Sequence, residues 1–126
     1  KPKARRKSGA RGIMQILPST FREVQKKNPH FKDLDSPRWN IAAGIYYDRR
    51  LYDKWRTPPP GEERLYFAFG SYNAGYGRIY QAFRRVPEDA EFWHAVRPYV
   101  PPQTRHYVSR IQRLMTQPAG ADLSLE

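Results

Sequence analysis

The chain has no cysteine, and its histidines do not form a recognisable metal-binding motif. The absence of cysteine excludes disulfides and thiolate zinc sites. The three histidines, His30, His94 and His106, do not have the spacing of metal ligands, and we predict that His94 lies on the surface. We therefore expect chemistry that uses neither a metal nor a cofactor.

The carboxylates are the remaining candidates for proton transfer. Asp48 falls on the apolar stripe of a predicted helix, where a lone carboxylate more often pairs with an arginine or a tyrosine than takes part in catalysis. The other candidates stand at predicted helix starts, where interaction with the helix dipole explains them: Glu62, Glu63, Glu88, Asp89 and Glu91. We therefore assign no catalytic role to these six carboxylates.

Prolines and glycines divide the chain into five or six predicted helices. These helices are expected at residues 18–28, 37–55, 62–73, 78–85, 87–97 and 103–117. No stretch alternates with the period of two that a strand requires. The pattern predicts a compact all-α fold with one domain at residues 1–117. Residues 118–126 are expected to form a loose tail that carries the tag remnant Leu125–Glu126.

Three of these helices have apolar patterns that predict their place in the core. The helix at 62–73 has almost no polar face, so we place it at the centre of the bundle. On the helix at 37–55, the core stripe is predicted to comprise Ile41, Gly44, Ile45, Leu51, Tyr52 and Trp55. On the last helix it is predicted to comprise Tyr107, Val108, Ile111, Leu114 and Met115.

The charge of the chain predicts a polyanionic partner. The formal net charge is +11 and the sequence pI is about 10.2, which favours binding to nucleic acid, anionic lipid or a carboxylate-bearing cell-wall polymer. The basic residues 1–8 lack an apolar period and predict a loop or arm. No apolar run approaches the ~18 residues that a membrane-spanning helix needs.

Four ordered segments carry a resemblance to a known family. They are Gly-Ala-Arg-Gly-Ile-Met-Gln-Ile-Leu-Pro-Ser-Thr at 9–20, Asn40–Ile41 with Gly44 and Tyr47, Ser-Tyr-Asn-Ala-Gly-Tyr-Gly at 71–77, and Thr-Arg-His-Tyr-Val at 104–108. Over residues 2–115 the chain resembles the soluble lytic transglycosylases, relatives of goose-type lysozyme. Residues 92–96, together with Tyr76–Gly77, resemble the membrane-bound lytic murein transglycosylases of this family more than its large soluble members.

The resemblance implies a lysozyme-like helical domain that lacks its catalytic-acid helix. In the family, the catalytic glutamate stands in Glu-Ser-x-Phe-x-Pro-x-Ala-x-Ser, directly before the Gly-Ala-x-Gly segment. Pro2 and Ala4 fit the Pro-x-Ala of this motif, whereas Arg6 occupies its last serine. Counting back places the glutamate before Lys1, so the chain by itself is expected to be inactive.

The implied reaction cleaves the MurNAc-β-1,4-GlcNAc bond of peptidoglycan. One glutamate first protonates the departing sugar oxygen and then takes the proton of the muramic acid 6-hydroxyl, which closes a 1,6-anhydro ring. This scheme needs an apolar pocket that keeps the glutamate protonated, and neutral groups that position the sugar. By resemblance, Met14 and Gln15 floor the cleft, Tyr72 and Asn73 flank the scissile bond, and Tyr107 orients the acid or the acetamido group.

The same residues have structural alternatives. Met14 and Ile16 are also core candidates, because an apolar run beside a helix start usually packs inward. The Asn-Ala-Gly sequence is suited to ending a helix, which gives Tyr72 and Asn73 a possible structural role. Tyr107 fits a core position as well as a site.

Three functions follow from these observations. The leading one is an enzyme of the bacterial cell envelope, in the periplasm or at the inner face of the outer membrane. It would be a monomer acting on peptidoglycan glycan strands, with outer-membrane association through parts not in this chain. The second is a non-catalytic peptidoglycan-binding module. The third is a basic nucleic-acid-binding helical domain, which the scattered placement of the basic residues disfavours.

Overall fold

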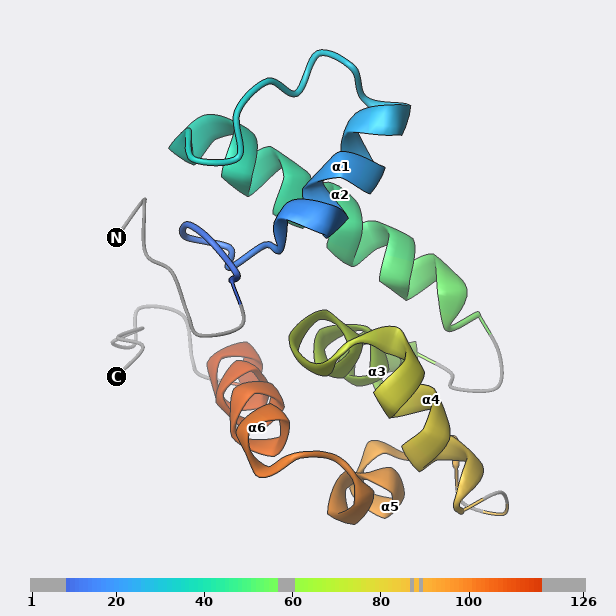
Figure 1. Ribbon diagram of the computed structural model, residues 1–126. Coiled ribbons are helices and arrows are strands. Elements are labelled where there is room, and N and C mark those ends of the chain that lie inside the picture. The colour runs from blue at the N-terminus through green and yellow to red at the C-terminus, as the bar shows by residue number, and fades with distance from the viewer. Residues whose placement is uncertain (1–8, 57–60, 87, 89, 117–126) are drawn as a thin grey trace. The chain divides into compact units, whose positions relative to one another are not determined.

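The computed structural model describes residues 9–56, 61–86, 88 and 90–116 (Figure 1). Within these ranges the helices are α1 (Pro18–Lys27), α2 (Pro37–Lys54), α3 (Gly61–Ala74), α4 (Tyr76–Arg84), α5 (Trp93–Val96), the 3-10 helix η1 (Arg97–Tyr99) and α6 (Pro102–Thr116). No strand forms among the described residues, and the prediction of an all-α fold is confirmed. The predicted basic arm at 1–8 and the tail at 118–126 lie outside these residues.

The chain divides into two compact units, residues 1–50 and residues 51–126. The division falls within α2. The assignment of residues 1–117 to one catalytic domain stays a prediction. Each unit has its own cluster of buried apolar side chains.

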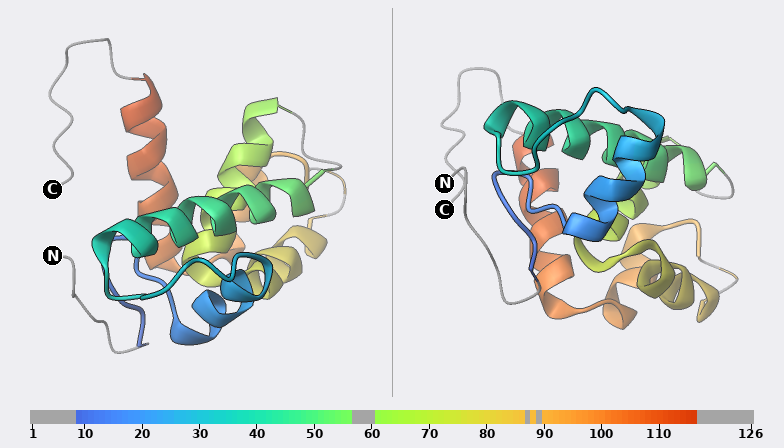
Figure 2. Two further views of the ribbon diagram at one scale, coloured as in Figure 1. Left: turned by 90° about the horizontal axis from the view of Figure 1, so that it is seen from above. Right: turned by 45° about the horizontal axis from the view of Figure 1, so that its top comes forward.

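The first unit is built from the segment before α1, from α1 itself and from the first part of α2. Pro18 occupies the first turn of α1, where a missing N–H costs no helical hydrogen bond. At the other end, the side chain of Asn28 donates a hydrogen bond to the carbonyl of Val24 (2.9 Å). In Figures 1 and 2, α1 lies beside α2. Their shared core contains Ile16, Phe21, Val24, Phe31, Leu34 and Ala43.

The buried face of α2 differs from the predicted stripe. Ile41 and Ile45 are 37% and 62% exposed, so their assignment to the core is wrong. The predicted positions Gly44, Leu51 and Trp55 are buried as expected. The buried face also includes Asn40 and Ala43, which precede Gly44 at the i, i+3, i+4 spacing of a helix face. The prediction counted only apolar residues as buried and therefore missed Asn40. The amide of Asn40 is buried because it forms hydrogen bonds with backbone groups.

The second unit has α3 at its centre, as predicted. This helix contacts α4, α5 and α6 and buries Tyr66, Phe67, Ala68, Gly70 and Ser71. A side chain at Gly70 would meet the Trp93 ring, because a Cβ there would lie 2.7 Å from Cη2. The glycine thus allows the indole to pack directly against the α3 backbone.

The later helices correct three predictions. The helix expected at 87–97 is α5 alone, followed by η1, because a carboxylate oxygen of Glu63 accepts the backbone N–H of Trp93 (2.5 Å) and fixes the helix start there. Helix α4 starts at Tyr76, since Gly75 alone, with φ of 95°, breaks the chain from α3. Helix α6 agrees with its predicted range within one residue, but Met115 is 45% exposed and does not belong to the core.

Candidate functional site

The segment that carries Met14 and Gln15 is a closed loop in the first unit. Arg11 and Ile16 exchange two backbone hydrogen bonds, of 2.9 and 3.0 Å, which close the loop at its base. Gly12 has φ of 77° and Gln15 has φ of 50°. The side-chain amide of Gln15 donates to the carbonyl of Gly12 (2.7 Å). A positive φ is uncommon outside glycine, and such backbone is typical of functional loops whose surroundings hold them in place.

Asn40 on α2 supplies that support. Its side chain is fully buried. Its Oδ1 accepts the backbone N–H of Met14 (2.8 Å), and its Nδ2 donates to the carbonyls of Arg11 (2.9 Å) and Leu34 (3.1 Å). A Cβ at Gly12 would lie 2.3 Å from Nδ2 of Asn40. The absence of a side chain at Gly12 thus allows Asn40 to approach the loop and to hold it against α2.

Met14 is held through a second close approach to α2. A Cβ at Gly44 would lie 2.6 Å from Cε of Met14, so this glycine makes room for the methionine. Met14 is half-buried and packs against the core of the first unit, in agreement with its structural alternative. Arg11, beside it in the loop, pairs with Asp35 (2.5 Å).

The Ser-Tyr-Asn-Ala-Gly segment forms the end of α3 in the second unit. Ser71 is fully buried, and its Oγ accepts the indole N–H of Trp55 (2.8 Å). The hydroxyl of Thr104 donates to Oδ1 of Asn73 (2.8 Å), which ties the end of α3 to the start of α6. Asn73 and Gly75 do end a helix, and Asn73 also has this tertiary partner.

The remaining predicted residues of the second unit are half-buried. Tyr72 precedes Asn73 on α3. Tyr107 lies one turn after Thr104 on α6 and packs against the core of its unit. Met14 and Gln15, which are neighbours in the sequence, thus share one closed loop of the first unit. In the second unit, Thr104 anchors Asn73 to the helix that carries Tyr107.

Asp48 is a half-buried carboxyl on α2. Its Oδ1 has no hydrogen-bond partner among the described residues, so the expected pairing is not found at this atom. Burial raises the pKa of Asp48 from 3.8 to about 6. Burial also raises the pKa of the neighbouring Tyr47, with smaller contributions from the charges of Glu23 and Asp48. Asp48 is therefore a carboxyl that titrates near the lower end of the physiological range.

Sequence reasoning missed the roles of two residues, Asn40 and Thr104. Both lie in the family segments, but neither was predicted to support the site. The feature that marks both residues is a polar side chain on a buried helix face, since Asn40 is 0% exposed and Thr104 is 1% exposed. Buried polar side chains are nearly always hydrogen-bonded, which makes them markers of tertiary contacts.

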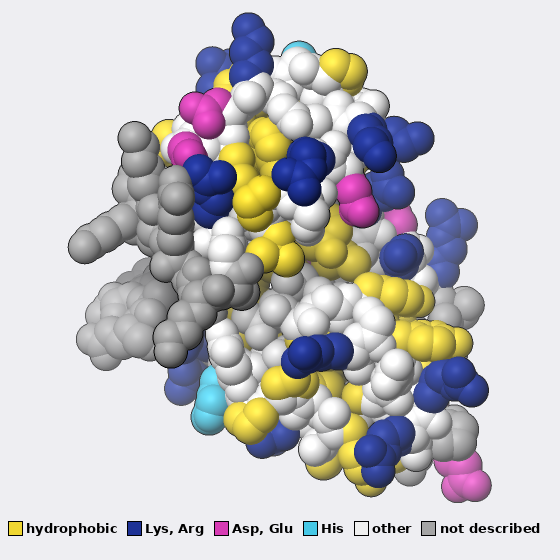
Figure 3. Space-filling model, in the orientation of Figure 1, with side chains coloured by type: hydrophobic (Ala, Val, Ile, Leu, Met, Phe, Trp, Pro, Cys, Tyr) yellow, Lys and Arg dark blue, Asp and Glu magenta, His cyan; other side chains and the backbone are white. Residues whose placement is uncertain are grey.

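The described residues also bear on metal binding, membrane insertion and charge. In the described part of the chain, no group of three or more histidine, cysteine or acidic side chains is placed to hold a metal ion. No described helix has the length and apolar character to cross a membrane. On the face shown in Figure 3, lysine and arginine side chains are scattered among neutral and hydrophobic ones.

Comparison with known proteins identifies the class of this domain. The model of the family described as "Transglycosylase SLT domain" matches residues 1–94. The chain therefore belongs to the transglycosylase SLT domain family, and the family resemblance is confirmed. The match contains the first three of the four segments, and the fourth, at 104–108, lies beyond it.

Relatives within this class are lytic murein transglycosylases by name. The chain is 33% identical over 103 residues to "Membrane-bound lytic murein transglycosylase F" of Vibrio vulnificus (strain YJ016), covering 79% of the chain and 18% of the relative. The protein of that name from Maricaulis maris (strain MCS10) is 33% identical over 95 residues, covering 73% and 20%. The one from Yersinia pestis (strain Pestoides F) is 31% identical over 113 residues, covering 86% and 22%. The chain spans about a fifth of the length of these relatives. No solved structure matches.

Proposed function

We propose that this chain is the catalytic-domain portion of a peptidoglycan lytic transglycosylase. It would cleave the MurNAc-β-1,4-GlcNAc bond and leave a 1,6-anhydroMurNAc end. The observation that carries the proposal is the match of residues 1–94 to the SLT domain. The relatives named lytic murein transglycosylases support the same reaction.

The reaction requires one acid that acts twice. A glutamate, proposed to precede Lys1, gives its proton to O4 of the departing GlcNAc while the C1–O4 bond breaks. The 6-hydroxyl of MurNAc then bonds to C1, and its proton returns to the glutamate. All atoms are accounted for without water, and the glutamate ends in its starting form.

Five side chains are proposed to bind the substrate, namely Met14, Gln15, Tyr72, Asn73 and Tyr107. Hydrogen bonds that hold Gln15's loop and Asn73 in place support the proposal. Gln15 lies in the loop fixed by Asn40, and Asn73 is anchored through Thr104. Preorganised neutral groups suit a sugar, because they can donate and accept hydrogen bonds without reorganising when the substrate arrives. Tyrosines can in addition stack on a sugar ring while donating a hydrogen bond.

The proposed setting is the bacterial cell envelope, where peptidoglycan strands are the partner. The relatives are membrane-bound by name, which supports a location in the periplasm or at the inner face of the outer membrane. Any outer-membrane association would come from parts not in this chain. We propose that the domain acts as a monomer.

Mass spectrometry of the products from purified murein sacculi tests the proposal. The chain would be compared with a version extended upstream through the expected glutamate, and with the same extended version carrying glutamine in its place. Anhydromuropeptides should appear only with the intact extension. If neither the chain nor the intact extension yields them while both bind sacculi, the transglycosylase proposal is wrong and the non-catalytic binding module replaces it. Salt-sensitive retention on DNA, without binding to sacculi, would instead favour the nucleic-acid-binding domain.

A further inference from the structure

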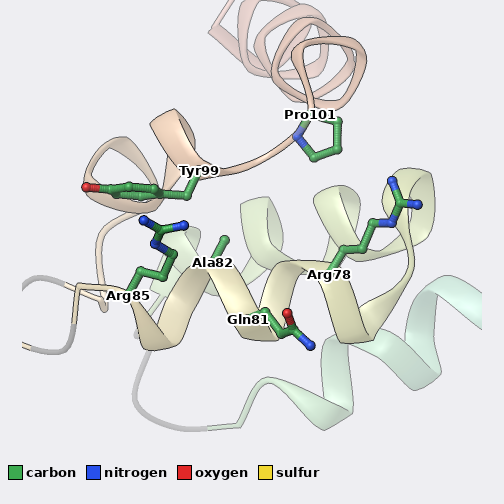
Figure 4. Close-up of a pocket in the computed structure, with 6 residues that line it drawn as sticks. All are labelled: Arg78, Gln81, Ala82, Arg85, Tyr99 and Pro101. Atoms are coloured by element: carbon green, nitrogen blue, oxygen red, sulfur yellow. The ribbon is translucent and has the colours of Figure 1, made fainter.

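A pocket of about 300 Å³ opens in the second unit between α4 and the segment that leads into α6 (Figure 4). Its size is at the lower end of the range for small-ligand sites. The described lining residues are Arg78, Gln81, Ala82, Arg85, Tyr99 and Pro101, and none of these is acidic. The pocket therefore has two positive charges and no balancing carboxylate among these residues.

The two arginines are spaced as a pair along one helix face. Arg78 lies on α4, and Arg85 is the residue directly after the end of this helix, where the backbone is still helical. Seven residues of helical backbone separate them, so they lie on the same face and about 10.5 Å apart along the axis. The small side chain of Ala82 lies between them on the floor of the pocket, and Tyr99 and Pro101 lie opposite the helix (Figure 4). The guanidinium groups point to different ends of the pocket, which suits a ligand with two separated negative groups rather than one small anion.

The ring of Tyr99 packs against the guanidinium group of Arg85. The Arg85 guanidinium lies over the Tyr99 ring at 4.6 Å from its centroid. Stacking fixes the plane of a guanidinium but leaves its N–H edges available to a planar acceptor. No hydrogen bond or ion pair joins the side chain of Arg78 or Arg85 to another side chain in the described part of the chain. The arrangement presents N–H donors of the kind that bind carboxylates in a bidentate manner.

The pocket is close along the chain to residues proposed to bind glycan. Pro101 is three residues before Thr104, whose hydroxyl binds Asn73, and Arg78 is five residues after Asn73. The pocket and Asn73 therefore lie in the same unit, on neighbouring segments of the chain.

We propose that this pocket binds the carboxylates of the peptide stems of peptidoglycan. This inference rests on the proposed function and adds recognition of the peptide to recognition of the sugar. An extended peptide advances at most ~3.3–3.6 Å per residue, so ~10.5 Å corresponds to about three residues. Two carboxylates of one short acidic peptide can therefore reach the two arginines.

Titration of the chain with a synthetic stem tripeptide, followed by nuclear magnetic resonance, tests the inference. The matched probe is the same tripeptide with its carboxylates converted to amides. We expect the acidic form to shift the signals of α4 and Tyr99 and the amide form to have little effect. Binding of the acidic form should weaken with added salt, because the arginines are exposed.

Substitutions of the pocket arginines test whether the peptide binds in this pocket. The double variant Arg78→Gln/Arg85→Gln should weaken binding about tenfold, the equivalent of about 1.4 kcal/mol for two exposed ion pairs. The control Arg84→Gln removes an exposed charge from the same helix but outside the pocket, so it should change the affinity less than about twofold. Circular dichroism would show that all variants retain their helices.

Three outcomes would overturn the inference: equal binding of the acidic and amide forms, unchanged binding by the double variant, or displacement of the peptide from α4 by an oligonucleotide. A peptide-free GlcNAc–MurNAc oligosaccharide separates this inference from the proposed function. If the oligosaccharide binds and the tripeptide does not, only the peptide pocket is wrong. If neither binds, the proposed function fails as well.

Discussion

Replacing Asn40 by alanine should loosen the loop that carries Met14 and Gln15. The amide of Asn40 makes three hydrogen bonds to backbone groups in a fully buried position. Each such bond contributes about 0.5–1.5 kcal/mol net, and a buried group left without a partner costs more. One affected group, the Arg11 carbonyl, keeps a hydrogen bond from the N–H of Ile16 (3.0 Å), which limits the loss.

We therefore expect Asn40→Ala to lower the free energy of unfolding by about 2 to 4 kcal/mol, a large part of the ~5–15 kcal/mol typical of a domain. The assay is urea unfolding followed by circular dichroism, with binding to a GlcNAc–MurNAc oligosaccharide measured on the folded variant. Binding should weaken, because the loop no longer holds Gln15 in its left-handed conformation.

Asn28→Ala is the matched control, because it removes a half-buried amide of the same unit that donates a hydrogen bond to the Val24 carbonyl at the end of α1. It should lower the free energy of unfolding by about 1 kcal/mol and leave oligosaccharide binding unchanged. If Asn40→Ala destabilised the chain no more than Asn28→Ala, the assignment of Asn40 as the support of the loop would be refuted.

Three further substitutions test other parts of the structure. The folded-state pKa of Asp48, about 6, lies above its ordinary 3.8, so its contribution to stability is present below pH 4 and lost as the pH rises through about 6. The difference between these two pKa values corresponds to about 3 kcal/mol, and solvent around this half-buried carboxyl reduces that energy. Asp48→Asn should therefore stabilise the chain by about 1 to 2 kcal/mol at pH 7. Urea unfolding from pH 4 to 8 measures the effect. Gly70→Ala should cost about 1–3 kcal/mol in thermal unfolding, because its Cβ would lie 2.7 Å from the Trp93 ring. Thr104→Val keeps the shape but removes the hydroxyl that binds Asn73, and should cost about 1–2 kcal/mol and weaken oligosaccharide binding in a calorimetric titration.

A control substitution for each of these three variants shows which result would contradict the prediction. Glu91→Gln, at an exposed carboxylate, should not stabilise the chain as Asp48→Asn does, and equal effects would contradict the role of burial. Gly77→Ala has open space around its Cβ and should be neutral or stabilising, whereas a cost equal to that of Gly70→Ala would contradict the packing argument. Thr116→Val removes an exposed hydroxyl, and weakened binding by this variant would show that the effect of Thr104→Val is not specific.

The helix boundaries were largely predictable because they depend on local chemistry. Pro18 and Pro37 mark the starts of α1 and α2 within the sequence, and Gly75 marks the break between α3 and α4. A proline fixes its own φ and a glycine permits a positive φ regardless of what packs against them. The start of α5 was not predictable in this way, because a carboxylate of Glu63, distant in sequence, fixes it.

The sequence by itself determined the helical class, the family and the segments that contain the candidate site. The tertiary structure decided how those segments are held: which face of α2 is buried, why Gly12 and Gly44 are glycines, and that Thr104 anchors Asn73. Hydrophobic periodicity can indicate that a helix has a buried face, but it treats every polar residue as exposed. A buried Asn40 becomes favourable only when backbone groups from other segments satisfy its amide, and that condition exists only in the folded chain.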